Sequence, residues 1–81
     1  MRFSEIVAEA PRYGVAFRQV RGRDGSDHGW VVERQADDVR AVVYRLGPRL
    51  WSACCGPVRF VGTQGNAAHW ALDQVANADP R

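Results

Sequence analysis

The chain has 81 residues, of which 46% are hydrophobic and 25% are charged, which predicts one globular domain, residues 1–81, and excludes intrinsic disorder. All eleven basic residues are arginine, but nine Asp and Glu leave a net charge of +2, too small to indicate nucleic-acid binding by itself. No apolar run approaches the ~20 residues of a membrane span and no signal sequence opens the chain, so we expect a cytoplasmic protein without membrane contact.

The first expected element is a short helix within residues 1–11. Ser4 is the candidate N-cap, Glu5 suits the first turn, and Pro11 ends the helix. A helix of this length is unstable alone, so its side bearing Ile6 and Val7 must pack on another element. A short edge strand is the competing interpretation.

The middle of the chain, residues 12–62, predicts a four- to five-stranded antiparallel sheet. Short turns between successive segments favour a meander, because parallel strands would need long crossovers. The loop over residues 21–29 is rich in Gly and Asp and is the longest connection. The last segment is either a fifth strand or a continuation of the fourth past a bulge. The predicted strands cover residues 13–20, 30–35, 39–46, 49–54 and 58–61.

The third predicted strand is apolar on both sides. Val42 and Tyr44 share one face with Arg40, while Val43 and Ala41 share the other. This pattern indicates a central strand, or one whose outer face is covered by a second copy of the chain. A homodimer therefore stays open.

A second helix is expected over residues 63–78, with Thr63 as its N-cap. An alanine-rich apolar stripe at helical spacing lets this helix lie close to the sheet: Ala68, Ala71, Leu72 and Val75. The expected fold is thus α+β, one small domain with an antiparallel sheet and both helices packed on one face. The other face must meet either water or a partner.

The residues that could hold a metal or perform catalysis form no recognisable site. Zinc sites use paired ligands at spacings such as Cys-x2-Cys, whereas Cys54 and Cys55 are adjacent and point to opposite faces of a strand. No spacing in the sequence places His28 or His69 beside a cysteine thiol. We predict no metal, no cofactor and no catalytic residue.

The basic middle of the chain is the most informative pattern, since residues 12–59 carry nine Arg against five Asp and Glu. Arginine and tryptophan dominate protein interfaces, and they also hold phosphates and stack bases. Trp30, beside the long loop, is expected to expose its ring, and Trp51 to join the core. The alternative is a solvated face whose arginines pair with Glu33, Asp37 and Asp38. The candidate partner-binding residues are Arg18, Arg21, Arg23, Trp30, Arg34, Arg40, Arg45 and Arg59.

In layout alone, residues 30–76 resemble the plant AP2-type and integrase amino-terminal DNA-binding domains, in which a three-stranded sheet precedes a helix. The shared pieces are a Trp-bearing strand at Trp30, the Phe60 and Thr63 approach to the helix, and Ala67 and Ala68 within it. The resemblance implies that Arg and Trp on the sheet read DNA.

The leading hypothesis is a non-enzymatic module that occupies a surface of another protein, as an adaptor, regulator or small inhibitor. Phages and mobile elements often encode such inhibitors. The alternative is DNA or RNA binding through the same arginine- and tryptophan-bearing face. A second alternative is a small thiol-dependent enzyme or redox sensor that uses Cys54 or Cys55.

Overall fold

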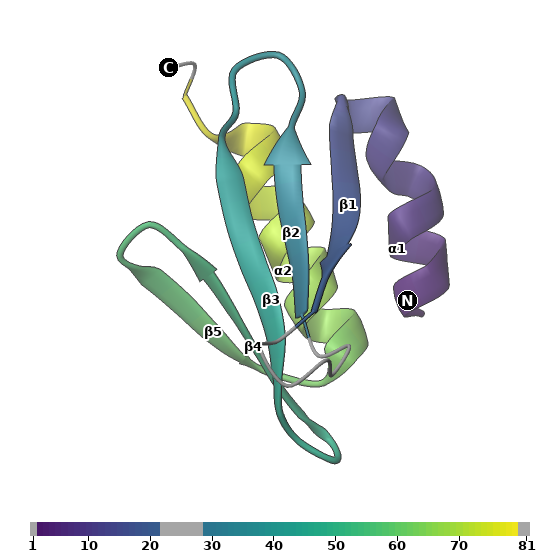
Figure 1. Cartoon of the computed structure of the whole chain (residues 1–81). Coiled ribbons are helices and arrows are strands. Elements are labelled where there is room, and N and C mark those ends of the chain that lie inside the picture. Colours follow the sequence, from purple (N-terminus) through teal and green to yellow (C-terminus); the bar gives the residue numbers. More distant parts are fainter. Residues whose placement is uncertain (1, 22–28, 80–81) are drawn as a thin grey trace.

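Five strands form one antiparallel sheet in the computed structural model, which describes residues 2–21 and 29–79. Each strand pairs with the next one along the chain, so the sheet is the predicted meander (Figure 1). The last segment is a separate fifth strand, which resolves the alternative of a bulged continuation. The strands are β1 (Val15–Val20), β2 (Gly29–Arg34), β3 (Arg40–Gly47), β4 (Leu50–Cys55) and β5 (Val58–Gly62).

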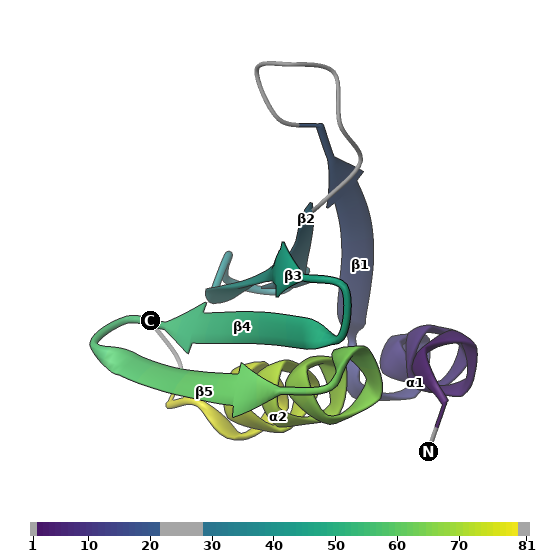
Figure 2. The ribbon, with the colours of Figure 1, turned by 90° about the horizontal axis from the view of Figure 1, so that it is seen from below.

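Two α-helices lie on one face of this sheet, as predicted. The helix α1 (Phe3–Glu9) runs into a 3-10 turn, η1 (Ala10–Tyr13), and α2 (Gln64–Asn77) follows β5. Figure 1 looks onto the sheet with α2 behind it and α1 beyond β1. The sheet is strongly twisted, and in Figure 2 the strands β1 and β4 run in clearly different directions. The structure therefore confirms the α+β class and leaves one face of the sheet without a helix.

Two expected boundaries near the N-terminus are wrong. The first helix begins at Phe3, and its N-cap is Arg2 rather than Ser4. The carbonyl oxygen of Arg2 accepts a hydrogen bond from the amide of Ile6. The first strand begins at Val15 rather than at residue 13. Pro11 stands at the start of η1, where its missing N–H costs nothing, and helical structure continues to Tyr13.

The core lies between the sheet and the two helices. Cross-strand register places Val32 opposite Ala41 and Val43 opposite Ala53, so these side chains share the face that α2 covers. The predicted stripe of α2 is buried against them, with Ala67 in addition. Thr63 is the N-cap of α2, as predicted, since its side chain accepts from the amide of Asn66.

The β4–β5 hairpin depends on a glycine at its turn. Gly56 has a φ of 59°, and a Cβ built there would meet no atom within 4 Å. Replacement by alanine therefore costs only the backbone strain of the left-handed region, about 1–2 kcal/mol. We expect Gly56→Ala to lower the free energy of unfolding in urea by that amount.

The matched control is Gly47→Ala, at a glycine whose φ is not positive and whose Cβ would make an ordinary contact with Leu50. This variant should lose clearly less stability than Gly56→Ala. Equal losses would contradict the conformational explanation.

Candidate interaction surface

The candidate interaction surface is the sheet face that neither helix covers, which we call the open face. Antiparallel pairing aligns its side chains in rows that cross the strands. The central row is Arg18, Val31, Val42, Cys54 and Arg59, and the row beside it is Val20, Gly29, Tyr44, Ser52 and Val61. Ala16, Glu33 and Arg40 form the third row.

The middle of the open face is apolar and partly exposed. Val42 is 43% exposed and Val61 is 48% exposed, although both lie on regular strands. A shallow hollow of about 430 Å³ is lined by Val20, Val31, Val42 and Tyr44, among others. Exposed apolar side chains that adjoin one another, unlike single ones, mark a surface that a partner can cover.

A charged group occupies one end of the open face. Glu33 accepts from Arg18 Nε at 3.3 Å and lies 3.5 Å from Arg40 Nε, so one carboxylate serves two guanidinium groups. Arg40 also lies 3.8 Å from Asp38. The arginines at this end therefore have acidic partners, in agreement with the alternative of a charge-paired face. Such exposed pairs contribute little to stability.

Arg59 is held differently, by hydroxyl groups. Its Nε donates to Ser52 Oγ at 3.3 Å, and its NH2 donates to the Tyr44 hydroxyl at 2.9 Å. Ser52 is fully buried, and the Tyr44 hydroxyl lies 3.9 Å from Cys54 Sγ. Arg59 thus lies across β4 toward β3 with its position fixed by neutral groups.

Arg34 lies on the covered face instead. Its Nε and NH2 donate to both carboxylate oxygens of Asp37, and its NH1 donates to the carbonyl oxygens of Val75 and Ala78 at the end of α2. The hydrogen bond with Asp37 raises the pKa of Arg34 above its ordinary value, although burial acts in the opposite direction. Arg34 is therefore a charged C-terminal cap of α2.

Three further side chains also point away from the open face: Trp30, Trp51 and Arg45. Trp30 is half-buried on the covered face, with its ring 5.0 Å from that of Phe3, so the expectation of an exposed ring is wrong. Trp51 packs against the core, as expected. Arg45 lies on the side of Trp51, and its Nε donates to the Gly47 carbonyl oxygen. Arg21 follows β1.

Arg23 and His28 lie outside the described residues. Of the eight predicted residues, the open face brings together Arg18, Arg40 and Arg59, and Arg21 lines its hollow. The apolar members of this surface were absent from the predicted set. Their signal was in the sequence, because Val42 and Tyr44 alternate with the core residues of the third strand and so give it two apolar faces.

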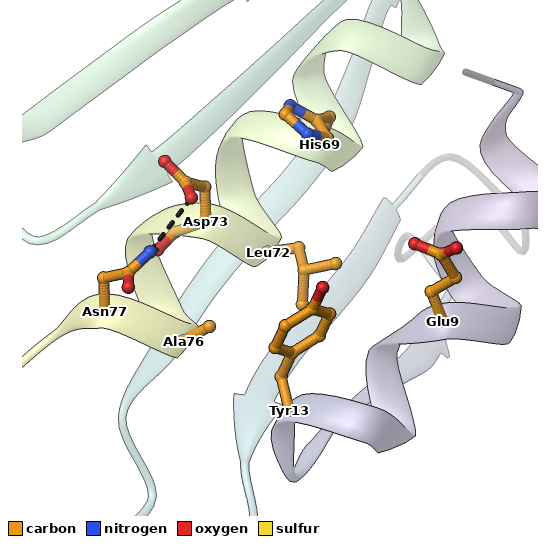
Figure 3. A pocket seen from close by; sticks show the side chains of 7 residues that line it. All are labelled: Glu9, Tyr13, His69, Leu72, Asp73, Ala76 and Asn77. Atoms are coloured by element: carbon orange, nitrogen blue, oxygen red, sulfur yellow. Dashed lines mark hydrogen bonds between the residues drawn. The ribbon is translucent and has the colours of Figure 1, made fainter.

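A second hollow, of about 270 Å³, lies between the first helical segment and α2 (Figure 3). His69, Asp73 and Asn77 line it from α2, and Glu9 and Tyr13 line it from the opposite side. Asn77 donates to the carboxylate of Asp73 at 2.9 Å. This hollow belongs to the helical layer, whereas Cys54 belongs to the open face. The sheet therefore separates His69 from the Cys54 thiol, and the two do not form a nucleophile and base.

Residues 2–21 and 29–79 contain no group of three or more His, Cys, Asp or Glu side chains placed to hold a metal ion. Among the same residues, no helix combines the length and apolar character needed to cross a membrane. Cys55 points away from the open face, and its sulfur lies 3.6 Å from the Arg40 carbonyl oxygen. No known protein-family model matches the chain, and neither a curated protein nor a solved structure shows significant similarity to it.

Proposed function

We propose that this protein is a non-enzymatic binding module that occupies the surface of another protein through its open face. The observation that carries the proposal is the exposed apolar centre around Val42, on a sheet face that no helix covers. Covering such side chains releases roughly 25 cal/mol per Å² of apolar area. A few valines and one tyrosine therefore supply a useful part of a binding energy.

The contents of the open face favour a protein partner over a nucleic acid. Base stacking needs exposed aromatic rings, but Trp30 faces the helices. Binding along a nucleic-acid backbone needs several available cations, but Arg18 and Arg40 share Glu33, and Arg34 caps α2. Exposed valines contribute nothing to either contact and suit the apolar centre of a protein interface.

The test uses two valine variants that match in exposure and differ in face. Val42→Asp places a charge in the centre of the open face, and Val58→Asp places the same charge on the other side of the sheet. The two valines are 43% and 49% exposed, so both variants should fold. Proteins captured on the immobilised wild-type chain are identified, and their Kd values are then measured by calorimetry with all three chains.

We expect Val42→Asp to weaken the partner at least ~10-fold, as a charge buried at the centre of an interface does, while Val58→Asp keeps the wild-type Kd. Capture that survives Val42→Asp unchanged contradicts the proposal. A duplex oligonucleotide is titrated in parallel at two salt concentrations. Tight binding with a log-affinity slope near −0.9 per contacted phosphate would establish the nucleic-acid alternative instead.

A further inference from the structure

The side chain of Arg59 keeps one edge of its guanidinium group available. Its Nε–H and one NH2 hydrogen are directed to Ser52 and Tyr44, which lie along the same side of the group. A guanidinium has five N–H donors, so the end formed by NH1 and the second NH2 hydrogen has no partner among residues 2–21 and 29–79. These two parallel N–H groups match the two oxygens of a carboxylate.

The two other open-face arginines already have acidic partners. Arg18 directs its Nε to Glu33, and Arg40 lies between Glu33 and Asp38. Within the described part of the chain, Arg59 is the open-face arginine whose contacts are hydroxyl groups alone. Its charge is therefore oriented without being neutralised, and little side-chain entropy remains to be lost when an anion binds.

The neighbours of Arg59 strengthen this arrangement. Ser52 is fully buried, so the hydroxyl that anchors Nε is itself immobile. Val61 stands beside Ser52 across the β4–β5 pair and is 48% exposed. A partner that covers Val61 and Val42 also removes water from around the guanidinium, which makes a charge-assisted hydrogen bond stronger.

We propose that Arg59 binds an aspartate or glutamate carboxylate of the protein partner, with Tyr44 and Ser52 as the residues that position it. The inference rests on the proposed function and names the chemistry of the partner: an acidic side chain flanked by apolar ones. Charge complementarity favours this partner over a second copy of the chain. The open face has three arginines and one glutamate, so two copies would bring like charges together.

The first experiment tests the carboxylate contact with a defined probe. The probe is acetyl-Leu-Glu-Leu-amide, compared with the glutamine version of the same peptide. Both are titrated to ~50 mM, a range suited to weak isolated contacts, into the full chain labelled with 15N. The arginine Nε–H signals and the backbone amide signals of Ser52 and Val61, which lie beside Arg59, are followed by NMR. We expect the Arg59 signal to shift with the glutamate peptide and to stay in place with the glutamine peptide.

The variants separate a specific contact from general attraction. Arg59→Gln should abolish the peptide-dependent shifts of the Ser52 and Val61 amide signals, and the matched control Arg18→Gln should keep them. Arg59→Lys retains the charge without the two-donor edge and should bind clearly more weakly. The absence of any shift, equal shifts with both peptides, or a full response in Arg59→Gln overturns the proposal. So does inorganic phosphate that shifts the Arg59 signal at lower concentration than the glutamate peptide.

The partner obtained in the valine experiment gives the second test. We expect Arg59→Gln to weaken that partner ~10-fold or more, the usual effect of removing a hydrogen bond to a charged group. If Val42→Asp loses the partner and Arg59→Gln retains its full affinity, this inference is overturned and the proposed function stands. If Val42→Asp retains the partner, the proposed function fails, and the peptide titration alone decides the role of Arg59.

Discussion

Replacing Ile6 with alanine is expected to lower the free energy of unfolding by about 2–5 kcal/mol. Ile6 is fully buried, and it is the residue of α1 that lies wholly inside the core. Alanine would lose its transfer free energy and leave a cavity that the short α1 cannot close by shifting. A domain of 81 residues has only about 4–12 kcal/mol of stability, so this loss is a large part of the total.

Urea unfolding followed by circular dichroism measures the effect. Ile6→Val serves as the control, because it removes one methylene from the same place and should cost about 0.5–1.5 kcal/mol. An Ile6→Ala variant with the midpoint of the wild-type chain would show that α1 is not docked on α2 and the sheet.

The second large effect is expected at Arg34. Arg34→Met keeps the aliphatic length of the side chain but removes every hydrogen bond to Asp37 and to the end of α2. The carbonyl oxygens of Val75 and Ala78 lose their donor, and the helix terminus loses its positive charge. We expect a lower urea midpoint and faster amide exchange in the last turn of α2.

Arg18→Met is the matched control, since the Arg18 side chain is 59% exposed and that of Arg34 is 14% exposed. A substitution at such an exposed site changes stability by about 0.5 kcal/mol or less. Equal midpoints for the two variants would contradict the capping role of Arg34. The pKa of Arg34 is raised in the folded chain. Its contribution to the free energy of unfolding is therefore constant around neutral pH and is lost only in strongly alkaline solution. The difference between the variants should be the same at pH 6 and pH 9.

The fold could be predicted from the sequence because its signals are local. Each strand is a short apolar run closed by turn residues, and Thr63 and the alanine stripe mark α2. The error at Tyr13 has a local cause as well. Tyr13, Val15 and Phe17 alternate as in a strand, but Gly14 adopts a φ of 68° and interrupts it.

The site could be predicted only in part, because alternation within one strand does not tell which face the helices cover. That choice depends on the register between β1 and β2, which sets Arg18 opposite Val31 and Gln19 opposite Trp30. Arg18 and Trp30 consequently lie on opposite faces, although both stood in the predicted set. The role of Arg34 depends on carbonyl groups 41 and 44 residues away in sequence, which no local pattern indicates.

The order of the elements along the chain also governs how the protein is made. All strand pairing joins neighbours in sequence, so the five strands can pair as they leave the ribosome. The helix that covers them, α2, comes last, and α1 packs chiefly against α2 rather than against the strands. At a synthesis rate of roughly 5–20 residues per second, the valines of the covered face remain exposed until α2 has emerged. Chaperones that recognise apolar segments are therefore expected to act on the nascent sheet and to release it once α2 docks.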